Sequence, residues 1–214
     1  MRYFIRGLGL ISQALLFLSL FAFLIKKIEI EKEKKFFIFF IAFNFLSEIF
    51  SRTTTWFKII NIGAAHVYFS VEFFFFFFIL YQWENRFKRS WLISGAVVGV
   101  FVLIDNFIIT PFSKFAVFSA SSQNFFLFLF SAHQIIEITT KNFIPFYRDD
   151  RFYIAAGIFV YSSITALMFL LYNFFTVILP FNIGYLSIIC MNFFFTYSMV
   201  LYYRQRKMLA EALK

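Results

Sequence analysis

The chain has 214 residues, of which 62% are hydrophobic and only 14% are charged, and its mean hydropathy is +0.80. Soluble globular domains usually carry about 25% charged residues, so this composition excludes a soluble enzyme. The net charge is +9 and Phe alone contributes 40 residues. Because a backbone in lipid must pair its own polar groups, the sequence predicts an all-α polytopic membrane protein.

Seven apolar stretches are candidates for membrane spans, since about 20 helical residues cross roughly 30 Å of hydrocarbon. The second stretch is short and carries three polar side chains. Pro111 and Pro180 fall in turns between stretches, where a missing N–H costs little. The sequence therefore predicts a seven-transmembrane helix bundle with spans at Leu8–Ile25, Phe36–Phe50, Ile59–Gln82, Trp91–Ile109, Phe115–Thr139, Phe152–Leu179 and Asn182–Tyr203.

The basic residues outside the spans predict the orientation, because Lys and Arg are retained on the cytoplasmic side. The first, third and fifth loops and the C-terminal end hold 15 Lys and Arg, and the opposite side holds five. This bias predicts an outside N-terminus and a basic cytoplasmic tail, residues 204–214, after a transmembrane domain of residues 1–203. A signal peptide over residues 1–25 is the alternative, but no small-residue cleavage site precedes Lys26. Nucleic-acid binding is not expected from this charge.

Two pairs of similar segments predict an internal repeat. Asn61-Ile62-Gly63 at the start of the third span recurs as Asn182-Ile183-Gly184 in the seventh, and Ser12-Gln13 recurs as Ser122-Gln123 in the fifth. Both pairs run in the same membrane direction, so they predict a three-plus-one-plus-three parallel repeat. Coincidence in a phenylalanine-rich chain is the alternative.

Four acidic residues lie within the predicted spans, where each costs about 2.5–3.5 kcal/mol on insertion scales. Glu137 and Glu48 lie near span ends and can reach water, and Arg52 is placed to pair with Glu48 at i,i+4. Asp105 lies in the outer third of the fourth span. Glu72 lies at mid-depth with no such exit, so it is expected to face the bundle interior.

Polar residues gather in the half of the predicted bundle that faces outward, which predicts a polar pocket with Glu72 at its floor. Tyr68 lies one turn before Glu72 on the same helix face. The alternative is that these side chains only join helices, at about 0.6 kcal/mol each. The candidate ligand- or proton-binding residues are Glu72, Tyr68, His66, Asp105, Asn106, Gln123, Asn124, Tyr161, Asn182 and Asn192.

Several kinds of chemistry find no support in the sequence. Residues 182–203 contain no lysine for a retinal Schiff base. His66 and His133 lie at opposite depths, and His133 with Glu137 at i,i+4 supplies only two ligands, too few for a catalytic zinc. We find no glycine-rich phosphate loop and no Ser–His–Asp arrangement. The expectation is therefore a non-enzyme without a metal or a cofactor.

Four features carry a family resemblance. They are the segment Val67–Glu72, the basic third loop, the stretch from Gly157 to Tyr161 before a Phe-rich segment, and the spacing of Asn182 and Asn192. In these features the chain resembles uncharacterised seven-transmembrane proteins of Bacteroidota that are often encoded beside histidine kinases or response regulators. The resemblance implies a signalling role in the bacterial inner membrane, with a histidine kinase or response regulator as partner.

The sequence as a whole predicts a sensor that binds an external small molecule and passes a helix shift to a cytoplasmic partner. The cytoplasmic loops and the tail Arg204–Lys214 are the expected docking surface for that partner or for the lipid bilayer. A small-solute or proton-coupled transporter, with Glu72 and Asp105 taking up protons, is the first alternative. A structural subunit of a larger membrane complex is the second.

Overall fold

A computed structural model describes residues 7, 10–11, 13–18, 20–21, 32–57, 62–141, 145–171 and 178–212. These residues form helices and no strand, which confirms the prediction of an all-helical chain. The elements are α2 (Lys32–Trp56), α3 (Ile62–Tyr81), α4 (Lys88–Ile104), the π-helix η1 (Asp105–Ile109), α5 (Val117–Lys141), the 3-10 helix η2 (Phe146–Arg148), α6 (Asp150–Leu170) and α7 (Ile178–Ala212).

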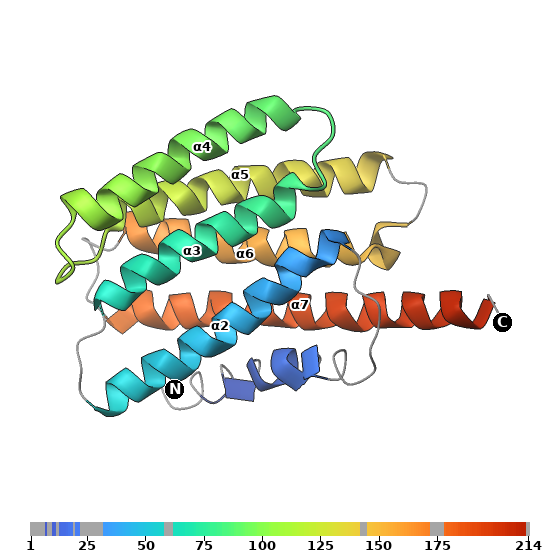
Figure 1. The fold of residues 1–214 in the computed structure, drawn as a ribbon, viewed down its shortest axis with the longest axis horizontal. Coiled ribbons are helices and arrows are strands. Elements are labelled where there is room, and N and C mark those ends of the chain that lie inside the picture. Colours follow the sequence, from blue (N-terminus) through green and yellow to red (C-terminus); the bar gives the residue numbers. More distant parts are fainter. Residues whose placement is uncertain are drawn as a thin grey trace.

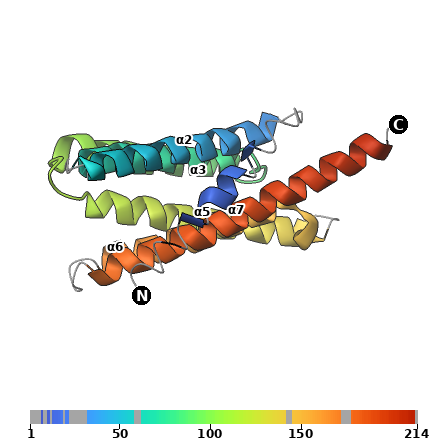
Figure 2. The same ribbon diagram turned by 90° about the horizontal axis from the view of Figure 1, so that it is seen from below.

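The long helices form two layers. Figure 2 shows α2 and α3 in one layer and α5, α6 and α7 in the other, and Figure 1 shows the helices running back and forth along a common long axis. The right-hand end in Figure 1, where α3 ends and α4 and α6 begin, is here called the Glu84 end. The left-hand end, where α3 and α7 begin, is called the His66 end.

Four helical segments in the described part of the chain are long and apolar enough to cross a membrane, namely Ile62–Tyr81, Lys88–Ile109, Asp150–Leu170 and Leu186–Met208. Helices α2 and α5 have 25 residues each but are more polar. The structure thus confirms a membrane-compatible helical protein.

Several helix bounds differ from the predicted spans. The span predicted over Phe36–Phe50 is part of the longer α2, and the span predicted over Phe152–Leu179 is α6, which ends at Leu170. Hydropathy marks the apolar centre of a helix, whereas backbone hydrogen bonding carries the helix into its polar flanks. Pro180 was expected in a turn but lies in the first turn of α7, where its missing N–H has no helical acceptor.

Helix α7 has 35 residues and continues unbroken to Ala212. The segment predicted as a separate basic tail from Arg204 onward therefore extends the last span as far as the structure describes it. In Figure 1 this part of α7 projects beyond the other helices at the Glu84 end.

Aromatic side chains fill the space between the layers. The ring centroids of Phe40 and Phe76 lie 4.6 Å apart, and those of Phe37 and Phe195 lie 5.0 Å apart. Phe40, Phe76 and Phe195 are fully buried. Such offset and edge-to-face pairs contribute about 0.5–1.5 kcal/mol beyond their area burial. We call Phe37, Phe40, Phe76 and Phe195 the aromatic layer.

Gly95 allows α4 to approach α3 closely, as small residues do between membrane helices. A Cβ at this position would lie 2.2 Å from Cε2 of Phe77. The Phe77 ring has little room to move because it stacks on Tyr81 and contacts Phe126 and Phe130. We therefore expect Gly95→Ala to destabilise the protein by about 1–3 kcal/mol.

Thermal unfolding of the purified protein in detergent checks this expectation. Gly63→Ala is the matched control, because its Cβ would lie 3.5 Å from Phe112, an ordinary van der Waals distance. Equal melting temperatures for the two variants would contradict the close-contact argument.

Candidate ligand-binding cavity

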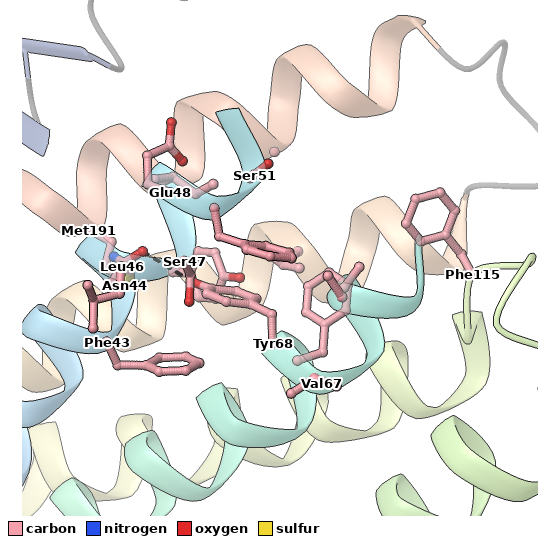
Figure 3. Close-up of a pocket in the computed structure, with 18 of the residues that line it drawn as sticks. Phe43, Asn44, Leu46, Ser47, Glu48, Ser51, Val67, Tyr68, Phe115 and Met191 are labelled. Carbon is pink, nitrogen blue, oxygen red and sulfur yellow. Dashed lines mark hydrogen bonds between the residues drawn. The ribbon is translucent and has the colours of Figure 1, made fainter. Parts of the chain in front are cut away.

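A cavity of about 950 Å³ lies between the two layers, towards the His66 end (Figure 3). Its walls come mainly from α2, α3, α6 and α7, and most of the lining is apolar, in contrast to the polar pocket that the sequence predicted. The polar residues in the described lining are Gln13, Asn44, Ser47, Glu48, Ser51, Tyr68, Tyr161 and Thr165.

Two lining tyrosines share one buried carboxylate. The Tyr68 hydroxyl donates to Oε1 of Glu72 at 3.0 Å, and the Tyr161 hydroxyl donates to Oε2 at 3.0 Å. Glu72 is only 1% exposed and does not itself line the cavity. Tyr68 lies one turn before Glu72 on α3, whereas Tyr161 reaches it from α6. We call these three residues the Glu72 cluster.

The hydrogen bonds of the Glu72 cluster fix what the tyrosines can offer to a ligand. Each hydroxyl has a single proton, which is used on the carboxylate, while its oxygen keeps acceptor capacity. The Oδ1 atom of Asn44 lies 3.5 Å from the Tyr68 hydroxyl and is a further acceptor. At the Glu72 cluster the cavity wall therefore offers acceptors, and a ligand that donates hydrogen bonds would match this part of it.

His66 belongs to a separate buried network nearby. Its Nδ1 lies 2.8 Å from the carbonyl oxygen of Asn106, and its Nε2 lies 2.8 Å from that of Lys114. The Asn106 amide donates to the Ser70 hydroxyl at 2.9 Å, and Ser70 donates to the carbonyl of His66. These bonds join α3 to η1 and to the segment that precedes α5.

Asp105 completes this network from the π-helical turn. It accepts from the Thr110 hydroxyl at 2.8 Å and from the backbone N–H of Ser119 at 3.0 Å. Ser119 lies in the first turn of α5, so the carboxylate caps the positive end of that helix. Asp105, His66 and Asn106 therefore have structural partners, and none of them lines the cavity.

The remaining candidate residues do not join the Glu72 cluster. Gln123, Asn124 and Asn192 are buried but do not line the cavity. Asn182 lies in α7, but its side chain is outside the described residues, as is that of Arg52, the expected partner of Glu48. Of the ten candidates, the structure brings together Glu72, Tyr68 and Tyr161 at the cavity, and His66, Asn106 and Asp105 in the separate network.

Sequence reasoning did not single out Glu84, which follows α3. Its Oε1 accepts from the N–H groups of Arg86 and Phe87 at 2.9 and 2.8 Å. Its Oε2 lies 2.8 Å from Nε2 of His133 and accepts from the Gln134 amide at 2.8 Å. His133, which lies at i,i+4 from Glu137 on α5, contacts Glu84.

Glu84 thus connects the start of α4 to the middle of α5. Burial raises the pKa of its carboxyl group, but the N–H groups of Phe87 and Arg86 together with His133 stabilise the charged form, so that the pKa is lowered overall. The side chain is 1% exposed. Arg86 and Phe87 are neighbours of Glu84 in the sequence, but His133 and Gln134 lie 49 and 50 residues away, so the sequence held no signal for these two contacts.

A buried ion pair lies at the same end of the bundle. Lys34 at the start of α2 pairs with Asp150 at the start of α6. The Lys34 ammonium also lies 5.4 Å from the ring centroid of Trp83 and 5.5 Å from that of Tyr202. The Ser198 hydroxyl of α7 donates to the carbonyl of Asp150 at 3.0 Å. This contact set ties α2, α6, α7 and the end of α3 together.

No group of three or more potential metal ligands lies together in the part of the chain that the structure describes. Comparison with protein-family models, with curated proteins and with solved structures finds no match for this chain. The resemblance to the seven-transmembrane proteins of Bacteroidota therefore stays a prediction.

Proposed function

We propose that this protein is a membrane sensor that binds an external small molecule in the cavity between α2, α3, α6 and α7. The observation that carries the proposal is the position of the Glu72 cluster. It combines a buried carboxylate with two tyrosines in the wall of a cavity of about 950 Å³. Ligand sites are typically apolar cavities of 300–1,000 Å³ with a few placed polar groups.

The proposed topology is a seven-span bundle in a bacterial inner membrane, with the N-terminus outside and a three-plus-one-plus-three repeat. The bias of Lys and Arg supports its orientation, because it assigns the Glu84 end to the cytoplasm. The cavity lies towards the opposite, His66 end. In this topology the cavity faces the outer side, as a receptor for an external molecule requires.

The proposed output runs along α7. This helix lines the cavity at Gly184, Ile188 and Met191 and continues to Ala212 at the opposite end. A ligand that shifts the first part of α7 thereby moves the exposed basic residues near its end. We propose that a histidine kinase or response regulator docks there. Such a partner is expected to co-purify with the full chain, and to be lost from a variant truncated after Tyr203 if α7 is its docking site.

Photolabelling in lipid nanodiscs tests the binding function. A neutral alkyl alcohol carrying a diazirine is expected to label cavity residues such as Met168 and Met191. Ala65→Trp fills the cavity wall and should remove most of this labelling. Val97→Trp is the control, because Val97 is 65% exposed on α4 and does not line the cavity. Labelling confined to lipid-facing positions such as Leu186 would contradict the proposal.

A transporter is the second candidate, because the cavity is closed towards the Glu84 end. Phe76 lies one turn beyond Glu72, the aromatic layer lies between the cavity and the Glu84 end, and the Lys34–Asp150 pair lies at that end. A solute path would have to open both. Solute flux into liposomes that is lost in Glu72→Gln would favour transport, whereas binding without flux favours the sensor.

A further inference from the structure

We propose that the ligand of this cavity is a lipophilic amine in its ammonium form, that is, an apolar body with one positively charged nitrogen. The inference rests on the proposed binding function and specifies the chemistry that the Glu72 cluster recognises. Three features of the cavity carry it: the hydrogen-bonding groups, the charge and the aromatic lining.

The hydrogen-bonding groups select a donor. The protons of Tyr68 and Tyr161 are directed at the two oxygens of Glu72, at 3.0 Å each. The two tyrosines can therefore offer a ligand only the lone pairs of their hydroxyl oxygens, and Asn44 Oδ1 lies beside that of Tyr68. An ammonium group carries donors and no acceptor, so it fits the two tyrosine oxygens better than a carbonyl, an ether or an anion.

The charge of the cavity selects a cation. The described lining contains no Lys, Arg or His, and Glu72 lies directly behind the two tyrosines. Among the described residues, no ion pair neutralises Glu72 within hydrogen-bond distance. A buried carboxylate is costly to ionise without a cationic partner, and an ammonium ion held against the tyrosine oxygens would stabilise its charged form. An anionic ligand would meet repulsion instead.

The aromatic lining suits the same ligand. Phe43 stacks on Tyr68 with ring centroids 5.8 Å apart, and Phe69 meets Phe169 edge to face at 5.8 Å. Aromatic faces attract cations through their quadrupoles, and most strongly where water is excluded. The rest of the wall is aliphatic or aromatic and accommodates an apolar body. A small hydrated cation would leave this apolar surface unused.

The ammonium group could come from a free amine or from the headgroup of phosphatidylethanolamine. The cavity favours the free amine, because the described lining offers no basic side chain to the phosphate of a lipid. Binding is therefore measured in nanodiscs of phosphatidylcholine and phosphatidylglycerol, with phosphatidylethanolamine added in a separate arm.

The experiment compares two probes of equal shape, 4-phenylbutylammonium and 4-phenylbutanol. Charge-assisted hydrogen bonds are roughly twice as strong as neutral ones, so the wild-type protein is expected to bind the ammonium about tenfold more tightly. Glu72→Gln should abolish this preference while retaining binding of the alcohol. Glu211→Gln is the matched control, since Glu211 forms only an exposed pair with Lys207 at 3.7 Å, and it should leave the preference unchanged.

The outcomes separate this inference from the proposed function. Equal affinity of the wild-type protein for the two probes would overturn the amine assignment and leave the cavity as a binding site. This comparison needs no variant, so it decides the matter even where Glu72→Gln does not fold. Failure of the neutral diazirine probe to label the cavity would overturn the binding function itself. Competition by phosphatidylethanolamine would support the ammonium chemistry and identify a lipid as its source.

Discussion

Replacement of Lys34 by Met alone is expected to destabilise the folded protein by roughly 3–5 kcal/mol, because it leaves Asp150 buried without its counter-charge. The side chains of Lys34 and Asp150 are 6% and 10% exposed, so water can do little to solvate the remaining carboxylate. The variant also loses the cation–π contacts with Trp83 and Tyr202. Thermal and denaturant unfolding of the purified protein measure the loss.

Two further variants separate a buried-charge effect from lost packing. The double variant Lys34→Met with Asp150→Leu removes both charges, and it should recover much of the lost stability, since apolar pairs often replace buried ion pairs at little cost. Lys207→Met breaks the exposed pair with Glu211 and should change stability by less than about 0.5 kcal/mol. A double variant as unstable as the single one would contradict the electrostatic explanation.

Glu84→Ala is expected to lower the free energy of unfolding by roughly 3 kcal/mol, because four donors lose a shared buried acceptor. Those donors lie on Arg86, Phe87, His133 and Gln134. Glu84→Gln keeps one carbonyl oxygen and should be intermediate. Unfolding of the purified protein in detergent at pH 7 measures both variants. If Glu84 stabilised only the start of α4, the NMR signals of His133 would be the same in the variants as in the wild-type protein.

The lowered pKa of Glu84 also predicts how stability depends on pH. A depressed folded-state pKa means that the carboxylate contributes its full stability above the unfolded pKa of about 4.3. That contribution is lost as the pH falls through the lower, folded-state pKa. The wild-type protein should therefore lose stability more steeply than Glu84→Gln below about pH 4.3. Parallel pH profiles for the two proteins would contradict this assignment.

The helical architecture was predictable because composition and apolar run length alone select it. The bounds of α5 agree with the predicted span within two residues at each end, since its polar flanks are short. The contact of Tyr68 with Glu72 was also predictable, because residues at i and i+4 share a helix face. The second tyrosine, Tyr161, is 89 residues away, and its pairing depends on how α6 packs against α3.

The separation of the candidate residues into two networks was not predictable from the sequence. Depth in the membrane places His66, Asp105 and Glu72 in one half of the bundle. The neighbour that each side chain points to depends on how its helix is rotated about its own axis. Rotation directs His66 towards η1 and Glu72 towards α6. Asp150, which pairs with Lys34, and His133 and Gln134, which contact Glu84, come from helices distant in sequence. The positions of Lys34 and Glu84 outside the predicted spans therefore gave no sign of their burial.

The length of α7 has a mechanical consequence. About 21 residues separate Met191, in the wall of the cavity, from Ala212, and at about 1.5 Å per residue they span roughly 32 Å. A small tilt of a helix of that length is therefore amplified at its far end. Tilting α7 by about 5° around the cavity would move its C-terminal end by about 3 Å.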